Sequence, residues 1–292
     1  MIFGADPEFQ MSDEEFRLIR DLVYNHCGMF FASDAKYLLE KRLSSRLAYH
    51  NLASYKDYYL LLKYDIRKEQ EMSDLMDVLT TNETYFFREA FQLKAFTDEI
   101  VPEIVAAKSK KGDRSLRIWS AGCSTGEEPY TIAMLLLENP LLKDWRIEII
   151  GTDISHRVLL QARKGVYGKG SFRATDAAYV EHYFREQEGG SYKIADQVRE
   201  LVTISQLNLF DHNRLALLGR MDIIFCRNVI IYFDQPAKKK VVEMFCQALY
   251  PGGFLLLGHS ESLMNITTLF TLRHLKNDMV YQKPLTVSGG VL

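Results

Sequence analysis

The sequence predicts an α/β protein in which an all-helical N-terminal domain precedes a doubly wound, Rossmann-like domain with a small antiparallel β insertion. Three observations support this fold class. Apolar residues recur at helical spacing through roughly the first hundred positions. Short apolar runs then alternate with helical patterns, as they do in the βαβ units of a parallel sheet. Residues 165–205 interrupt that alternation around a Gly-Gly turn.

Four helices are expected in the N-terminal part. Ser12 followed by Glu15 is a capping-box pattern ahead of an apolar set at helical spacing. The other three helices are expected over residues 36–49, from residue 54 into the sixties, and over residues 69–79. Because no alternating β-branched run interrupts this stretch, we predict a helical domain over residues 1–80.

The second domain is expected over residues 81–285. Its strands are predicted at residues 116–121, 146–152, 221–226 and 253–258, and its helices at residues 127–138, from 155 onward, and at 236–249. The insertion at 165–205 is expected to contain strands at 192–195 and 201–204. Residues 286–292 are expected to form a flexible tail.

Charge and composition exclude several classes of function. The 292 residues carry a formal net charge of -2, whereas a nucleic-acid-binding domain is usually strongly basic. No apolar run approaches the roughly 20 residues of a membrane span, and the first residues lack the pattern of a secretory signal. The four cysteines form no Cys-x-x-Cys pair, which argues against a zinc site or a disulfide framework. We therefore expect a cytoplasmic protein without a metal ion, a nucleic-acid partner or direct membrane insertion.

The segment 120–130 is expected to bind a ligand. It ends a predicted strand, turns through two glycines and enters a helix, but it matches neither the dinucleotide fingerprint nor the P-loop. Glu127 and Glu128 occupy the helix start, where a phosphate would otherwise sit. Asp153 ends the next strand, where an acid can accept hydrogen bonds from ribose hydroxyls. The pattern favours an adenosine-bearing ligand without phosphates, such as S-adenosylmethionine; the alternative is that the glycines only turn the chain and the acids cap helices.

Five segments resemble the chemotaxis receptor methyltransferases of the CheR type. They are residues 80–89 (TTNETYFFRE), 120–130 (SAGCSTGEEPY), 151–154 (GTDI), 225–233 (FCRNVIIYF) and 258–261 (GHSE). The resemblance covers nearly the whole chain and implies a class I methyltransferase domain. It also implies that S-adenosylmethionine donates a methyl group to glutamate side chains on the cytoplasmic helices of chemoreceptors. Such a carboxylate is already ionised at neutral pH, so no general base is needed.

The resemblance also implies which residues form the site. Arg88 and Tyr232 are expected to act in catalysis by holding and orienting the reacting groups, and which partner each one handles stays open. Glu127 remains the neighbouring alternative to Glu128 as the acid that contacts the cofactor. The expected cofactor contacts are Asn82, Thr84, Arg88, Glu128, Asp153, Asn208, Leu209, Arg227 and Asn228.

The helical domain is expected to bind the receptor. Residues 36–68 carry eight basic side chains against three acidic ones, and Arg42 and Arg46 lie one turn apart on a helix face. Such a face could seat an acidic receptor helix, and the alternative is an ordinary solvated surface. The turn at 186–192 looks shorter than in relatives that grip a receptor peptide there, which counts against such a tether. A monomer is expected.

Overall fold

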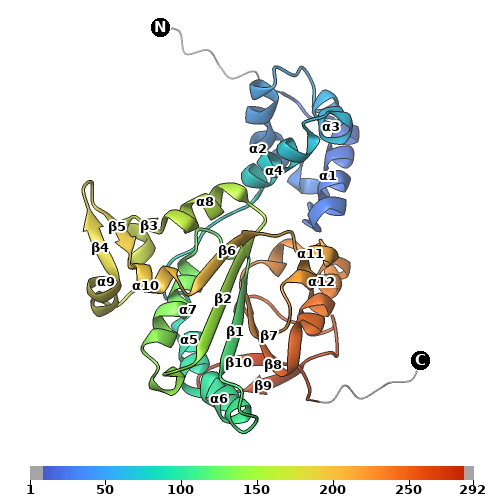
Figure 1. Cartoon of the computed structure of the whole chain (residues 1–292). Coiled ribbons are helices and arrows are strands. Elements are labelled where there is room, and N and C mark those ends of the chain that lie inside the picture. Colours follow the sequence, from blue (N-terminus) through green and yellow to red (C-terminus); the bar gives the residue numbers. More distant parts are fainter. Residues whose placement is uncertain (1–8, 286–292) are drawn as a thin grey trace.

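The computed structural model describes residues 9–285, which form two parts that meet at one edge of a β-sheet (Figure 1). Within these residues, four α-helices make the N-terminal part, and a seven-stranded sheet with helices on both faces makes the larger part. A three-stranded sheet projects from one side of the larger part. This architecture confirms the predicted fold class. The tail expected at residues 286–292 lies outside the described residues.

The N-terminal helices form where the sequence predicts them. They are α1 (Asp13–Cys27), α2 (Lys36–Tyr49), α3 (Tyr55–Tyr64) and α4 (Lys68–Leu79). The capping box is present: the Ser12 hydroxyl accepts the backbone N–H of Glu15 at 3.2 Å, and the Glu15 carboxylate accepts the backbone N–H of Ser12 at 2.8 Å. The leucines spaced four residues apart on α2 are fully buried and form the core of this part (Leu39, Leu43, Leu47).

The main sheet has the strand order β6-β2-β1-β7-β8-β10-β9. Its strands are β1 (Ser115–Ala121), β2 (Arg146–Asp153), β6 (Val202–Gln206), β7 (Met221–Cys226), β8 (Leu249–Leu257), β9 (Thr271–His274) and β10 (Met279–Gln282). The strands from β6 to β8 in this order run parallel, and β10 is antiparallel to both of its neighbours. The direction of the strand order reverses between β1 and β7, and sheets of this kind bind ligands beyond the carboxyl ends of the strands at such a switch point.

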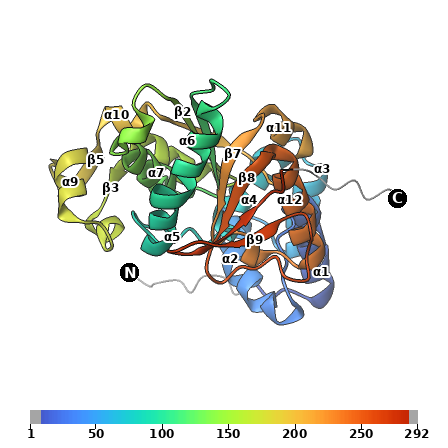
Figure 2. The same cartoon turned by 90° about the horizontal axis from the view of Figure 1, so that it is seen from below.

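Helices cover both faces of the sheet (Figure 2). One face carries α5 (Ala90–Ala95), α6 (Val101–Ser109) and α7 (Glu127–Leu137), and the other carries α11 (His212–Leu217) and α12 (Gln235–Ala248). A further helix, α8 (His156–Lys164), follows β2 and contacts α4. The ring of Phe225 packs on Phe96 on one face, and Trp119 packs on Phe245 on the other, each with ring centroids 5.3 Å apart. Burial on both faces explains why the strands read as continuous apolar runs.

The insertion contains one of the two predicted strands and two strands that the sequence did not predict. Its antiparallel sheet has the order β3-β5-β4, and the short helix α10 (Asp196–Arg199) then leads the chain back to the main sheet. The prediction of a strand at 201–204 within the insertion is wrong. This run belongs to β6 of the main sheet, which pairs in parallel with β2, with Val202 opposite Ile149. A short apolar run has no local feature that tells the two sheets apart, so its pairing depends on where α10 returns the chain. The elements of the insertion are β3 (Val166–Tyr167), α9 (Ala177–Tyr183), β4 (Phe184–Gln187), β5 (Ser191–Ile194) and α10 (Asp196–Arg199).

Polar contacts attach the N-terminal helices to the carboxyl edge of the sheet. Asp77 of α4 accepts a hydrogen bond from the Ser155 hydroxyl at 2.6 Å and another from the backbone N–H of Arg157 at 3.2 Å. Further along the edge, the backbone N–H of Phe30 donates to the carbonyl of Tyr232 at 2.9 Å. The helices are thereby held above the strand ends, and the two parts enclose a pocket between them.

Candidate active site

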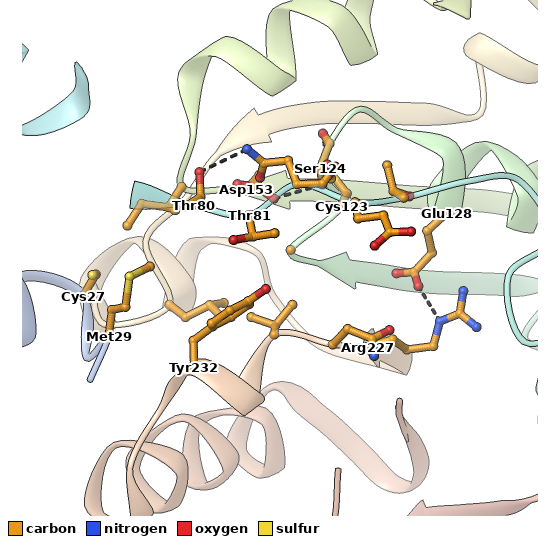
Figure 3. A pocket seen from close by; sticks show the side chains of 18 of the residues that line it. Cys27, Met29, Thr80, Thr81, Cys123, Ser124, Glu128, Asp153, Arg227 and Tyr232 are labelled. Carbon is orange, nitrogen blue, oxygen red and sulfur yellow. Dashed lines mark hydrogen bonds and ion pairs between the residues drawn. The ribbon is translucent and has the colours of Figure 1, made fainter. Parts of the chain in front are cut away.

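A pocket at the switch point brings together the residues that the sequence analysis assigns to the cofactor (Figure 3). Tyr232, expected in catalysis, lies in the same wall, and Arg42 and Arg46 are not part of the lining. The lining includes all of the expected cofactor contacts: Asn82, Thr84, Arg88, Glu128, Asp153, Asn208, Leu209, Arg227 and Asn228. Segments that lie far apart in the sequence therefore converge on one cavity.

The first glycine of the loop after β1 allows two loops to approach closely. Gly122 has a φ of +82°, and a Cβ atom built there would lie 2.3 Å from Cγ2 of Val229, in the loop after β7. Any other residue at this position would be strained and would push the two loops apart. Gly122 therefore keeps the loops after β1 and β7 together at the floor of the pocket.

Asp153 ends β2 with its carboxylate held by the backbone. Its two oxygens accept the N–H groups of Ser124 and Ser155, each at 2.9 Å. Burial raises the pKa of Asp153 above its usual value, and these hydrogen bonds act in the opposite direction. Each carboxylate oxygen can accept more than one hydrogen bond, so Asp153 retains acceptor capacity toward the pocket.

Glu128, and not Glu127, is the acid that lines the pocket. Its carboxylate accepts from Nε of Arg227 at 2.5 Å and from the Ser120 hydroxyl at 2.7 Å. Glu127 points elsewhere, where it accepts from the hydroxyls of Thr125 and Ser171, and burial raises its pKa. Successive residues of a helix project about 100° apart, so only one of two adjacent acids can face a given side. Of the two acids, Glu128 is therefore the one on the pocket side of the helix.

The segment 80–89 lines the pocket and packs against the insertion. Phe86 is fully buried, its ring is stacked on Phe172 with centroids 5.3 Å apart, and its backbone N–H donates to the carbonyl of Ser171 at 2.9 Å. Phe86 is therefore a core residue. Arg88 lines the pocket, and its guanidinium donates to the carbonyl of Glu83 at 3.1 Å.

Apolar side chains from both parts form one end of the pocket. Leu207 and Leu209 are buried beside it, and Cys27 and Met29 line it from the N-terminal part. Asn208 joins the two sides, since its amide N–H donates to the carbonyl of His26 at 2.6 Å. Cys27 and Met29 were not expected at the pocket, because the family segments begin only at residue 80.

The sequence does contain a signal for the part of the pocket that Cys27 and Met29 form, and it lies at the end of α1. Gly28 is the C-terminal cap of that helix with a φ of +76°, and a Cβ atom there would lie 2.0 Å from the ring of Phe210. A glycine that ends a helix marks a left-handed residue, and here it also marks a close approach by the chain that follows β6.

The turn after β7 supplies two polar groups to the pocket. Asn228 has a left-handed backbone with a φ of +59°, and its Oδ1 atom is buried without a hydrogen-bond partner among residues 9–285. Tyr232 ends a 3-10 turn (Ile230–Tyr232), and its ring points into the cavity (Figure 3). Asn228 and Tyr232 both line the pocket, so this turn places two polar side chains at one wall.

The structure places Arg46 of the expected basic face in an internal ion pair. The guanidinium of Arg46 donates to Glu71 and to Asp74, each at 2.8 Å, and the Glu71 side chain is only 3% exposed. Burial opposes ionisation of Glu71, but hydrogen bonds from Arg46, Tyr58 and His50 outweigh it and lower the pKa of Glu71. The side chain of Arg46 therefore completes an internal ion pair between α2 and α4, which a pattern of charges along α2 does not reveal.

Arg42 has a different position from Arg46. Its guanidinium donates to the carbonyl of Leu79 and to the Thr81 hydroxyl, at the start of the segment that lines the pocket. Arg42 thus connects α2 to the segment 80–89, called the cofactor segment below, and is not an unpaired surface cation.

No group of His, Cys, Asp or Glu side chains within residues 9–285 has the arrangement of a metal site. Over the same range, no helix combines the length and apolarity that crossing a membrane requires.

Comparison with known proteins identifies both parts of the chain. Residues 14–80 match the all-alpha domain of CheR methyltransferase, and residues 82–279 match its SAM binding domain. A relative in Vibrio cholerae serotype O1, chemotaxis protein methyltransferase 2, is 38% identical over 278 residues, which cover 95% of each chain. The chemotaxis protein methyltransferase of Vibrio parahaemolyticus is 36% identical over 93% of this chain and 98% of its own, and that of Borreliella burgdorferi is 34% identical over 86% and 88%. The chain therefore belongs to the CheR family of S-adenosylmethionine-dependent methyltransferases.

Proposed function

We propose that this protein transfers the methyl group of S-adenosylmethionine to glutamate side chains of chemoreceptors and forms glutamyl methyl esters. The observation that carries the proposal is the pocket at the switch point, in which the five sequence segments typical of the family lie at or beside one cavity. The chain matches the family over both of its domains, and its relatives bear the name chemotaxis protein methyltransferase.

The two ends of the pocket suit the two ends of the cofactor. S-adenosylmethionine supplies a methyl group on a positively charged sulfur. The apolar end, with Leu207 and Leu209, suits the adenine ring, and Asp153 is in a position to accept hydrogen bonds from ribose hydroxyls. At the other end, the Glu128 carboxylate, which also accepts from Arg227, lines the pocket beside Asn228 and is in a position to attract an ammonium group.

Methyl transfer to a carboxylate requires positioning more than acid–base chemistry. The acceptor glutamate is ionised at neutral pH and is itself the nucleophile, so no base has to remove a proton. The protein has to align the acceptor oxygen with the methyl carbon, and alignment of this kind contributes about 7–11 kcal/mol in favourable cases. We assign this task to Arg88, which can hold a carboxylate through its guanidinium, and to Tyr232, which points its ring into the cavity.

The receptor is proposed to approach beside α2, next to the start of the cofactor segment. Arg42 lies at that junction and stays in the proposal, whereas Arg46 is withdrawn from it because its charge is paired with Glu71. Lys41, adjacent to Arg42, is exposed and supplies a positive charge to an acidic partner. A cytoplasmic location and a monomeric state, both expected from the sequence, are part of the same proposal.

The direct test is methylation of receptor-containing membranes. The purified protein is incubated with S-adenosylmethionine labelled in its methyl group and with membranes that contain the chemoreceptors of its own host. Label on the receptor band that is released by mild base as methanol is expected, because methyl esters are base-labile whereas methylated amines are not. Base-stable label, or no label above that of membranes lacking receptors, would contradict the proposal.

A further inference from the structure

We infer that Glu261 is a positioning residue for methyl transfer, because its carboxylate holds the backbone turn that presents Asn228 and Tyr232 to the pocket. Glu261 lies after β8, 30 to 33 positions beyond the turn residues that it binds. It is not part of the pocket lining, so its effect on the reaction is exerted through the turn. The inference rests on the proposed function only for its kinetic readout.

The Glu261 carboxylate accepts four backbone N–H groups. One oxygen accepts those of Asn228 and Gly258, each at 2.8 Å. The other oxygen accepts those of Val229 at 3.0 Å and Ile231 at 3.2 Å. Three of the four donors therefore belong to the turn after β7, and the carboxylate joins that turn to the end of β8.

The backbone of the turn has the shape that binds an anion. Asn228 is left-handed with a φ of +59°, and Val229 follows with φ -114° and ψ -48°. Successive residues of opposite handedness point their N–H groups into one concavity, which is a common anion site in proteins. Ile231 adds an N–H from the first turn of a 3-10 helix, where backbone donors have no partner within the helix. Glu261 occupies this concavity from within the chain.

The concavity is tightly closed around Glu261. A Cβ atom at Gly258 would lie 3.0 Å from the backbone nitrogen of Asn228, 3.0 Å from its side-chain nitrogen and 3.0 Å from a carboxylate oxygen of Glu261. Burial raises the pKa of Glu261, while hydrogen bonds from the surrounding backbone act in the opposite direction. Gly258 therefore leaves the space in which the Glu261 carboxylate binds the turn. Both residues belong to the segment 258–261, to which the sequence assigned no role.

The consequence for the reaction follows from what the turn carries. Asn228 and Tyr232 both line the pocket, and Tyr232 points its ring into the cavity. If the carboxylate is lost, three N–H groups of the turn lose their acceptor, and the turn is free to relax. A shift of about 1 Å at a reacting group can lower a rate about a hundredfold, so a small relaxation suffices to affect catalysis.

The test uses Glu261→Gln, which keeps the size of the side chain but replaces one acceptor oxygen by a donor. We expect the variant to stay folded, to bind S-adenosylhomocysteine about tenfold more weakly and to lose about tenfold or more in kcat on receptor membranes. Glu200→Gln, an exposed matched change, should leave both quantities unchanged. In a Tyr232→Phe background, the further loss of kcat caused by Glu261→Gln should be clearly smaller, because both changes act through the same turn.

Two measurements keep the inference testable if Glu261→Gln fails to fold. Gly258→Ala leaves the carboxylate in place but crowds the same turn, and it should weaken S-adenosylhomocysteine binding in the same direction. In the unaltered protein, the amide hydrogens of Asn228, Val229 and Ile231 should exchange with solvent slowly. Rapid exchange of these amides, parent-like binding and kcat in folded Glu261→Gln, or full additivity with Tyr232→Phe would overturn the inference. Absence of receptor methylation by the parent would instead count against the proposed function, since exchange and cofactor binding do not depend on it.

Discussion

The Asp153 carboxylate, held by two backbone N–H groups, is the acid that we propose binds the ribose of the cofactor. Replacing Asp153 by Asn removes the charge and turns one acceptor into a donor. Hydrogen bonds to charged groups contribute about 1.5–3 kcal/mol, so we expect the affinity for S-adenosylhomocysteine to fall at least about tenfold. Titration calorimetry measures the change, and Asp176→Asn, an exposed helix-cap residue, is the matched control. Parent-like affinity in a folded variant would exclude Asp153 from the cofactor site.

A variant of Tyr232 can distinguish an effect on cofactor binding from an effect on methyl transfer. The ring of Tyr232 points into the cavity, so Tyr232→Phe removes one hydroxyl at the pocket and little volume. We expect unchanged affinity for S-adenosylhomocysteine and a lower kcat on receptor membranes, by about tenfold or more if the hydroxyl orients a reacting group. Equal turnover of Tyr232→Phe and the parent would remove the hydroxyl from the catalytic machinery.

At the scale of elements, α2 carries two kinds of cation that the sequence does not separate. Arg46→Gln leaves Glu71 buried without its main partner, and breaking a buried ion pair in this way costs about 3–5 kcal/mol. We therefore expect a clear loss of unfolding free energy in urea for Arg46→Gln. Lys41→Glu changes an exposed charge on the same helix and should leave stability within about 0.5 kcal/mol of the parent.

Lys41→Glu also tests whether this face of α2 contacts the receptor. Lys41→Glu should slow receptor methylation at low salt while S-adenosylhomocysteine binding stays unchanged, because like charges would then face the acidic partner. Added salt should reduce the difference, since the screening length falls below about 8 Å above physiological ionic strength. Receptor methylation at the parent rate, measured at low salt, would return this face of α2 to an ordinary solvated surface.

The insertion supports the cofactor segment from outside the pocket. Phe172 stacks on Phe86, and Ser171 accepts the backbone N–H of Phe86, so the insertion helps to fix residues 80–89. Phe172→Ala removes the stacking without touching the pocket lining. We expect the affinity for S-adenosylhomocysteine to fall about fivefold, which corresponds to about 1 kcal/mol. Tyr37→Ala, an exposed aromatic on α2, is the control, and equal affinities for both variants would show that the insertion does not support the segment.

At the scale of the whole molecule, the pocket depends on how the N-terminal helices sit on the sheet. Asp77 lies outside the pocket but binds the hydroxyl of Ser155, whose backbone N–H in turn binds Asp153. Asp77→Ala should loosen this contact between α4 and α8 and lower the affinity for S-adenosylhomocysteine about fivefold, or about 1 kcal/mol. The increase in Tm at a fixed ligand concentration should shrink accordingly, because stabilisation by a ligand depends on its affinity.

The control for this contact is a change in the same part of the chain. Asp21→Ala removes an exposed acid of α1 and should leave the affinity at the parent value. If Asp77→Ala also binds S-adenosylhomocysteine like the parent, the contact between the two parts is not needed to shape the pocket.

Much of the fold and most of the proposed cofactor set were predictable from the sequence, because their signals are local. The capping box at Ser12, the leucine stripe of α2 and the buried run of β7 each depend on residues within a few positions of one another. The family segments are equally continuous, so their residues could be assigned one by one. All of the cofactor contacts named from these segments line the pocket.

The features that only the tertiary structure reveals are contacts between residues that lie far apart in the chain. β6 joins the main sheet rather than the insertion, the hairpin of β9 and β10 completes the sheet edge, and Arg46 pairs with an acid on another helix. Cys27 and Met29 reach the pocket from the N-terminal part, and Glu261 reaches the turn after β7 from the end of β8. Periodicity and motifs describe neighbours along the chain, whereas strand pairing, buried ion pairs and anion concavities depend on which distant backbone the folded core brings alongside.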